Sequence, residues 1–347
     1  MRRCDTSNAG GEETVSFLKY AVGANYGRFW KQLRSAAARD GRNPFLLAAD
    51  FLVCVPRYGC GLTDYLSYRF WNKSAGERRE YVTIRDSEEF YKKVSPDRYK
   101  DFFSIKTNFM TNFAAYTGRE FFAPAEDNAD GLGRFLRGRD AVMVKPVNGL
   151  AGRDVRKQPT AAIADAAAFH RELLDNGLFV EEVIVQHPEL AALCPASVNT
   201  IRVMTAAAGG RSELLFACLR VGAGADVDNF HVGGMAVHVN TETGALEGCA
   251  VNKSGEEFAC HPVTGLEFDG RVLPMWDEVR RVCLEAALVN PNIHVVGWDV
   301  AITPDGPVFV EGNRRPGFDL PQMTTHRGRK DLIRRTEELL ARAEPKH

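Results

Sequence analysis

Apolar side chains recur every three or four positions through much of the first hundred residues, the period of helices that bury one face. Residues 16–40 and 87–103 carry this pattern, and aromatic residues are frequent between them. At such spacing, aromatic side chains are typical of a hydrophobic core. We therefore predict a mainly helical N-terminal region, residues 1–100, with a structural or substrate-lid role.

Beyond this region, helical segments alternate with short apolar runs. The helical period appears at 106–118 and 164–177, and each of these segments ends in a glycine suited to a helix C-terminus. The runs at 141–146 and 179–186 predict strands. We expect residues 101–188 to form an α/β unit with the order strand, glycine loop, strand, helix, strand.

The C-terminal part, residues 189–347, alternates strands and turns before helices at 276–289 and 329–343. Between these two helices, the runs WDVAI and VFVEGN flank the turn Thr303–Pro307, which predicts a β-hairpin. The predicted fold class is therefore α/β, of the α+β type, with two α/β subdomains after the helical region.

Composition narrows the function classes. The chain has 347 residues, 45% hydrophobic and 26% charged, with a net charge of −1, so its overall charge gives no reason to expect nucleic acid as a partner. Eight cysteines without zinc-binding spacing indicate reduced core residues. No run is long and apolar enough for a transmembrane segment, and the N-terminus lacks a signal-peptide core. We expect a cytoplasmic protein and leave association with a membrane surface open.

Three oxygen-bearing side chains mark the predicted hairpin. Asp299 lies in its first strand, while Glu311 and Asn313 lie two residues apart in its second and share a face. Carboxylate and amide oxygens suit Mg²⁺, which usually retains substrate phosphates and waters as further ligands. The segment predicts a magnesium site, and the alternative is an ordinary acidic surface hairpin.

Cationic and glycine residues suggest a phosphate site. Lys145 ends a predicted strand directly before a loop with Gly149 and Gly152, whose backbone N–H groups could approach phosphate oxygens. The order differs from a Walker A loop, because the lysine precedes the glycines. Lys106 opens the helix upstream. A structural turn and an exposed helix lysine are the alternatives.

Two further strands carry charged side chains. Glu181 and Glu182 precede an apolar stretch that could hold an adenine, unless they belong to a surface strand. Arg202 and Arg220 alternate with apolar residues on later strands, and both would suit a carboxylate or phosphate in a cleft. A solvated or salt-bridged face is the alternative for each arginine.

Taken in order, these pieces resemble the ATP-grasp superfamily, and in detail its family associated with sugar transfer. The resemblance rests on the motifs KPVNGLAG, QHPEL, SVNTIR and DGPVFVEGN and covers the chain from about Tyr65 onward. It implies an ATP-grasp fold in which two α/β subdomains, 101–188 and 189–347, grip ATP.

The resemblance also implies roles for single residues. Lys106 and Lys145, with the loop of Gly149 and Gly152, would contact phosphates. The Glu181 side chain, the Glu182 carbonyl and the Ile184 amide would hold adenine, and Gln186 or Glu189 would replace the usual ribose ligand. Three residues would bind Mg²⁺: Asp299, Glu311 and Asn313. Three arginines would hold the substrate carboxylate or acyl phosphate: Arg202, Arg220 and Arg314, with Arg315 as an alternative to the last.

An enzyme of this kind activates a carboxylate as an acyl phosphate, which an amine then attacks. We therefore predict an ATP- and Mg²⁺-dependent carboxylate–amine ligase with small-molecule substrates, possibly sugar-linked, in polysaccharide or glycoconjugate biosynthesis. Two alternatives remain: a kinase that phosphorylates a hydroxyl group, and a nucleotide-binding module without turnover that docks glycosyltransferases.

Overall fold

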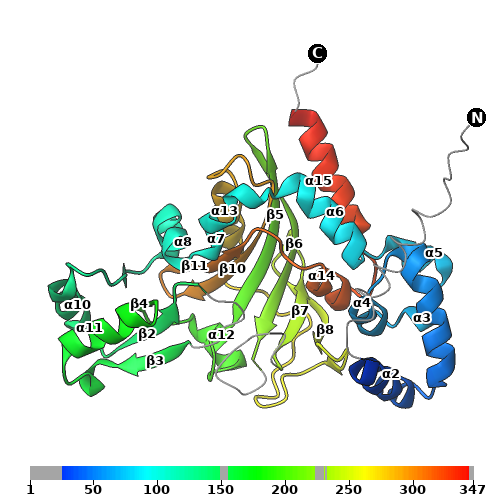
Figure 1. Cartoon of the computed structure of the whole chain (residues 1–347), viewed down its shortest axis with the longest axis horizontal. Coiled ribbons are helices and arrows are strands. Elements are labelled where there is room, and N and C mark those ends of the chain that lie inside the picture. Colours follow the sequence, from blue (N-terminus) through cyan, green and yellow to red (C-terminus); the bar gives the residue numbers. More distant parts are fainter. Residues whose placement is uncertain (1–25, 149–154, 223–229, 231–232, 344–347) are drawn as a thin grey trace, which may run out of the picture. The chain divides into compact units, whose positions relative to one another are not determined.

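The computed structural model describes residues 26–148, 155–222, 230 and 233–343. The chain divides into two compact units, which we describe separately (Figure 1). Unit 1 comprises residues 1–93 and 325–333, and unit 2 comprises 94–324 and 334–347. None of the helices within the described ranges is long and apolar enough to cross a membrane.

Unit 1 is helical over its described residues, as predicted from its apolar period, and residues 16–25 of that pattern lie outside the described residues. Its elements are α2 (Tyr26–Arg39), α3 (Pro44–Tyr58), α4 (Leu62–Ser67), η1 (Phe70–Asn72), α5 (Ala75–Glu80) and α6 (Ile84–Val94). The buried side chains include Phe29, Phe51, Tyr65 and Phe70. Phe51 and Tyr65 meet edge to face, with ring centroids 5.4 Å apart, so the aromatic residues form a core as expected.

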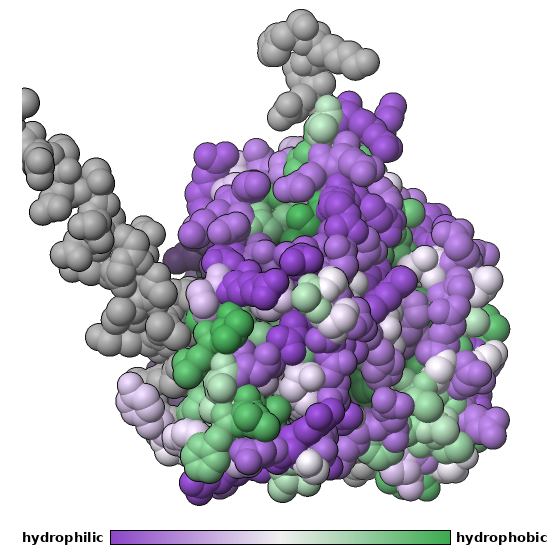
Figure 2. Space-filling model, turned by 90° about the vertical axis from the view of Figure 1, so that its right-hand side faces the viewer, coloured by the Kyte–Doolittle hydropathy of each residue, from purple (hydrophilic) through white to green (hydrophobic). Residues whose placement is uncertain are grey.

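Helix α3 buries one face and exposes an apolar one. Asn43 caps its N-terminus by accepting from the amides of Phe45 and Leu46. Leu46 and Val53 are 70% and 55% exposed, whereas Leu47 is 4% exposed. Figure 2 shows apolar patches on one face of the molecule, among a mostly hydrophilic surface.

The smaller sheet of unit 2 has four antiparallel strands in the order β1-β4-β2-β3. These strands are β1 (Phe121–Phe122), β2 (Ala141–Pro146), β3 (Arg156–Pro159) and β4 (Leu178–Glu182). The associated helices are α10 (Ala129–Leu136), η3 (Thr160–Ala162) and α11 (Ala166–Asp175). The apolar sides of α10, α11 and the sheet form one core around Leu132, Val144, Leu173 and Val180.

The larger sheet has seven antiparallel strands in the order β11-β10-β5-β6-β7-β8-β9. They are β5 (Thr200–Ala208), β6 (Arg211–Val221), β7 (Met235–Val239), β8 (Leu246–Asn252), β9 (Glu257–Phe258), β10 (Val295–Thr303) and β11 (Gly306–Asn313). The remaining helices are η2 (Asp97–Tyr99), α7 (Asp101–Ser104), α8 (Lys106–Asn112), α9 (Ala114–Thr117), α12 (Pro188–Leu193), α13 (Trp276–Ala286), α14 (Asp319–Thr324) and α15 (Lys330–Ala343). The mixed architecture, with helices first and antiparallel sheets after, agrees with the predicted fold class.

Two segment predictions need correction. The helix expected at 106–118 consists of α8 and α9, separated at Phe113, and it ends at Gly118 with a left-handed φ of 57°. The strand expected at 179–186 stops at Glu182. Beyond that point the chain leaves the smaller sheet and reaches the larger one, where the His187 amide donates to the Ile302 carbonyl at 2.7 Å. Apolar residues 183–185 therefore form a linker between the sheets, a role that hydrophobic period alone does not distinguish from a strand.

Candidate functional site

The predicted hairpin forms, and its register brings three charged side chains into one row. Asp299 on β10 lies opposite Glu311 on β11 and opposite Arg202 on β5. Directly opposite residues in an antiparallel sheet project from the same face. The row therefore crosses three strands with a carboxylate between a guanidinium and a second carboxylate.

Asp299 is held by two arginines. Arg202 donates to both of its carboxylate oxygens, with Nη2 at 3.0 Å from Oδ2, and Arg220 Nη1 lies 2.8 Å from the same Oδ2. Asp299 is only 2% exposed. Burial opposes its ionisation, yet Arg202 and Arg220 outweigh burial and hold the pKa of Asp299 well below its usual range.

This arrangement changes the interpretation of the strand arginines. Arg202 and Arg220 had been expected to face a substrate carboxylate or acyl phosphate. In the structure they neutralise Asp299, and neither is among the residues that line the cavity described below. The reason is the β5–β10 register, which places Arg202 opposite Asp299 and which the sequence does not reveal.

Glu311 and Asn313 face a cavity next to this ion pair. Asn313 Nδ2 donates to Glu311 Oε1 at 3.3 Å, which leaves the Asn313 side-chain oxygen for another contact. Burial, and then the neighbouring Asp299 carboxylate, raise the pKa of Glu311. Two carboxylates close together beside a cavity repel each other, and a divalent cation bound there would reduce this repulsion.

Gly312 allows two helices to pack against the strand that lines this cavity. A Cβ atom at this position would lie 2.7 Å from Phe103 Cε1 and 2.9 Å from Phe109 Cε2. These distances are shorter than normal van der Waals contacts, so only glycine lets α7 and α8 pack directly on β11. The glycine between Glu311 and Asn313 is thus required by packing.

Lys106 and Lys145 come together because the end of β2 pairs with the start of α8. The Lys106 amide donates to the Val147 carbonyl at 3.0 Å, and Ile105 forms a β-bridge with Asn148. Burial lowers the pKa of Lys106, and the nearby charge of Lys145 lowers it too, while Glu311 opposes this effect. Both lysines line the same cavity as Glu311.

The Glu181 carboxylate forms ion pairs with two basic side chains. Its carboxylate lies 2.5 Å from Lys145 Nζ and 3.1 Å from Arg119 Nη2. Burial would raise the pKa of Glu181, but Lys145 and Arg119 hold it below its ordinary value. The Glu181 side chain therefore fixes Lys145 in place, and its predicted contact with adenine would require a rearrangement of this ion pair.

Arg119 was not identified from the sequence. Besides Glu181, it donates to the carbonyls of Thr117 at 2.9 Å and Phe309 at 2.6 Å, so it joins α9, β4 and β11. No local motif marks this arginine, because its partners lie up to 190 residues away.

The linker residues lie on a different cavity. Glu182 and Ile184 line a space of about 540 Å³ bounded by the β10–β11 turn, together with Arg119 and Val308. The Glu182 carboxylate binds Arg139 Nη2 at 2.8 Å and the Glu120 amide at 2.7 Å. The structure thus does not bring Ile184 into the cavity of the two lysines, and the predicted backbone contacts with adenine stay a prediction.

The two ribose candidates differ in their surroundings. The Gln186 side chain donates to the Ser197 carbonyl at 2.8 Å and accepts from the Asn199 amide at 3.1 Å, so it fastens a loop. Glu189 is exposed in the first turn of α12 and lines neither cavity. Gly149 and Gly152 lie outside the described residues.

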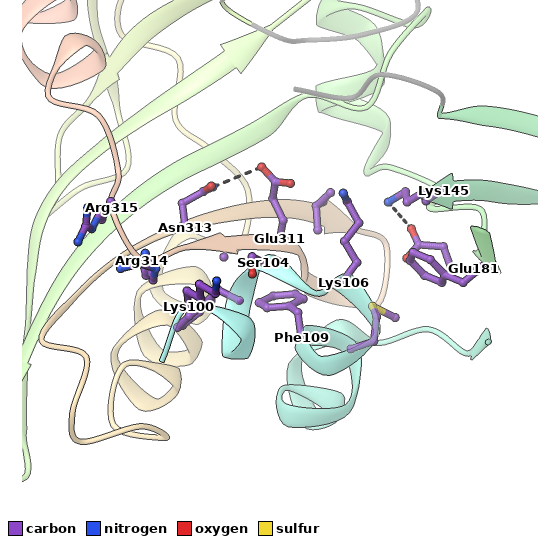
Figure 3. A pocket seen from close by; sticks show the side chains of 15 residues that line it. Lys100, Ser104, Lys106, Phe109, Lys145, Glu181, Glu311, Asn313, Arg314 and Arg315 are labelled. Carbon is purple, nitrogen blue, oxygen red and sulfur yellow. Dashed lines mark hydrogen bonds and ion pairs between the residues drawn. The ribbon is translucent and has the colours of Figure 1, made fainter. Parts of the chain in front are cut away.

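The first cavity, of about 410 Å³, collects most of the predicted phosphate and metal side chains (Figure 3). Lys106 and Lys145 lie toward one end, Glu311 and Asn313 lie in the middle, and Arg314 and Arg315 lie toward the other end. Among the described residues, no group of three His, Cys, Asp or Glu side chains is arranged to hold a metal ion. Of the three predicted Mg²⁺ ligands, Asp299 is bound by Arg202 and Arg220, so the Glu311 carboxylate and the Asn313 amide oxygen are the groups that would hold the ion, with phosphate and water oxygens.

Comparison with known proteins finds a family model that matches the C-terminal part of the chain. The model of the family described as sugar-transfer associated ATP-grasp matches residues 166–338. This range contains Arg202, Asp299, Glu311 and Asn313 and begins after the two lysines. No curated protein sequence matches the chain.

Similar solved structures, all at low identity, include two ligases and a synthetase. The ATP-grasp ligase PsnB complexed with a minimal precursor is 16% identical over 72% of this chain and 64% of PsnB, with a TM-score of 0.42. The D-cycloserine synthetase DcsG is 14% identical over 72% of this chain and 74% of DcsG, with a TM-score of 0.42. The D-alanine–D-alanine ligase from Coxiella burnetii is 14% identical over 68% of this chain and 59% of that ligase, with a TM-score of 0.38. The chain thus spans less than two thirds of PsnB and of the Coxiella ligase.

Proposed function

Because this chain belongs to the ATP-grasp superfamily, we propose that it is an ATP- and Mg²⁺-dependent ligase that joins a carboxylate to an amine. The observation that carries this proposal is the 410 Å³ cavity, which combines Lys106 and Lys145 with Glu311 and Asn313. Two lysine side chains beside a carboxylate and an amide oxygen suit a nucleoside triphosphate with its bound metal ion.

The proposed reaction has two steps. A carboxylate oxygen attacks the γ-phosphorus of ATP, the bond to the β-phosphate oxygen breaks, and ADP leaves. The amine then attacks the acyl carbon, and inorganic phosphate leaves with that carboxylate oxygen. Enzymes accelerate such steps chiefly by positioning the reactants and stabilising the charge on the transferred group.

Lys106 and Lys145 bind the phosphates in this proposal. Arg119 binds the Glu181 carboxylate, which in turn lies 2.5 Å from the Lys145 ammonium and so limits the freedom of Lys145 before the nucleotide arrives. A charged group fixed in advance loses less conformational entropy on binding than a mobile one. Lys145 is therefore a phosphate ligand, and Glu181 is its positioning residue.

Glu311 and Asn313 would hold Mg²⁺, and when bound the ion would neutralise charge on the phosphates. Asp299 does not bind the ion directly in this proposal, because Arg202 and Arg220 already bind its carboxylate. Its buried carboxylate fixes the two arginines and sets the electrostatic surroundings of Glu311.

The product amide would belong to a sugar-linked or glycoconjugate molecule, an assignment that rests on the name of the matched family.

Oxygen transfer tests the ligase proposal. Acceptors labelled with ¹⁸O in the carboxylate should deliver label into free phosphate, and hydroxylamine should trap a hydroxamate. ADP formation with a phosphorylated acceptor and no free phosphate would instead establish a kinase. Nucleotide binding without ADP release, across pools of uronic acids and amino acids, would favour a docking module.

A further inference from the structure

A second group of cations lines the cavity at the end away from Lys145. Lys100, Arg314 and Arg315 lie on this side, and Glu311 and Asn313 separate them from the two lysines (Figure 3). The cavity thus has a positive end at each side of its metal-binding residues. In the proposed function Lys106 and Lys145 bind the phosphates, and the cationic side chains at the other end have no assigned ligand.

Asp97 holds the two arginines side by side. Its Oδ1 accepts from Arg314 Nη2 at 2.7 Å and from Arg315 Nη2 at 3.0 Å, and Arg314 Nη1 also donates to the Ser95 carbonyl at 2.9 Å. The hydrogen bond from Arg314, and then the charge of Arg315, lower the pKa of Asp97. One carboxylate therefore orders two guanidinium groups next to the cavity.

The hydrogen-bonding capacity of this end is not used up. Each guanidinium has five N–H donors. Arg315 Nε is buried and finds no hydrogen-bond partner among the described residues. Three cations, Lys100, Arg314 and Arg315, face one anion, Asp97, so this end carries an excess positive charge of two if each group is ionised.

The anion that fits here differs from the carboxylate that is activated. The activated carboxylate must contact the γ-phosphate, whose proposed position is beside Lys106, Lys145 and Glu311. Glu311 and Asn313 lie between that position and the guanidinium groups of Arg314 and Arg315 (Figure 3). In this proposal the carboxylate beside the lysines is therefore a different group from the anion at the two arginines.

We propose that Lys100, Arg314 and Arg315 bind a second anionic group of the carboxylate substrate, which is not itself activated. This inference rests on the proposed function and specifies its substrate as a molecule with two anionic groups. The second group is a carboxylate or a phosphate ester, because a guanidinium fork binds both in bidentate fashion. Asp97 is the positioning residue of this subsite.

Calorimetric titration with three sugar acids tests the proposal. The protein is first saturated with Mg²⁺ and a non-hydrolysable ATP analogue, so that the probes cannot occupy the phosphate site. Glucuronate has one carboxylate, glucarate has two, and glucuronate 1-phosphate adds a phosphate ester. We expect at least one of the two probes with two anionic groups to bind about tenfold or more tightly than glucuronate, and the tighter of the pair identifies the second group.

Variants locate the effect. Arg315→Gln and Lys100→Ala should each reduce the preference for the probe with two anionic groups, and Arg315→Lys should restore part of it. Arg281→Gln, at an exposed arginine of α13, should leave the preference unchanged. Lys100 is exposed, so its variant should fold. It can therefore test the proposal even if the Arg315 variants do not fold.

Two different failures are distinguishable. If the nucleotide analogue binds but the three probes bind equally, or none binds, the anionic subsite is wrong and the nucleotide site stands. If the analogue itself does not bind to the wild-type protein, the proposed function is wrong.

Discussion

Asp299 lies directly opposite Arg202 in the β5–β10 ladder, and both of its carboxylate oxygens accept hydrogen bonds from that guanidinium. Arg220 adds a third bond from the next strand, β6. A residue that the sequence presents as a metal ligand is therefore instead the counter-charge of two arginines. Glu311 lines the cavity, so different predictions follow for Asp299 and for Glu311.

We expect Asp299→Asn to destabilise unit 2 by about 3–5 kcal/mol, because removing one partner of a buried ion pair leaves the other charge uncompensated. Urea denaturation measures this loss. Asp305→Asn, at an exposed acid in the turn of the same hairpin, should change stability by less than about 0.5 kcal/mol. Equal stability of the two variants would contradict the structural role of Asp299.

Glu311→Gln should have the opposite profile. The change removes a half-buried carboxylate that lies beside Asp299, so the melting temperature should rise or stay constant. It also removes the proposed metal ligand, so Mg²⁺-dependent ADP release should fall by about a hundredfold or more. Activity and melting temperature are measured against Glu267→Gln, at an exposed acid. Full activity in Glu311→Gln would exclude Glu311 as a metal ligand.

Lys145→Ala should weaken the use of ATP far more than Lys157→Ala. Lys145 lines the cavity and contacts Glu181, whereas Lys157 is an exposed residue of β3. A charge-assisted phosphate contact is worth about 1.5–3 kcal/mol, so kcat/KM for ATP should fall by roughly ten- to a hundredfold. Similar losses at both lysines would show that general surface charge governs binding.

Glu181 should make stability depend on pH. Its pKa in the folded protein is held below the ordinary value of 4.5, so its ionised form stabilises the fold above that pH. This contribution is lost as the pH falls through the folded pKa. The free energy of unfolding of the wild type should therefore exceed that of Glu181→Gln at about pH 7, and the gap should shrink below about pH 4.5. A gap that stays constant from about pH 7 to pH 3 would show that the Glu181 charge does not contribute.

The two faces of α3 should respond differently to substitution. Leu47→Ala removes a buried side chain and should cost about 2–5 kcal/mol of the stability of unit 1. Leu46→Ser and Val53→Ser, on the exposed face, should each change it by less than about 0.5 kcal/mol. Chemical denaturation measures each value. A large loss from Leu46→Ser would mean that this face is covered in the folded protein.

The sequence by itself predicted most of the elements and the ATP-grasp superfamily. Apolar period predicted the helical N-terminal region, glycines at 118 and 177 marked helix ends, and the turn between WDVAI and VFVEGN formed as expected. These signals are local, because helix period, turn chemistry and chain direction depend on neighbouring residues. The ordered motifs sufficed for the superfamily.

Only the tertiary structure decided which charged groups meet. The register of the ladder places Asp299 in contact with Arg202 and Arg220. The pairing of β2 with β4 places Glu181 in contact with Lys145. These contacts join residues 36 to 97 positions apart, so no local pattern encodes them. Whether a carboxylate binds a metal or neutralises an arginine depends on strand register and burial, which are properties of the assembled sheets.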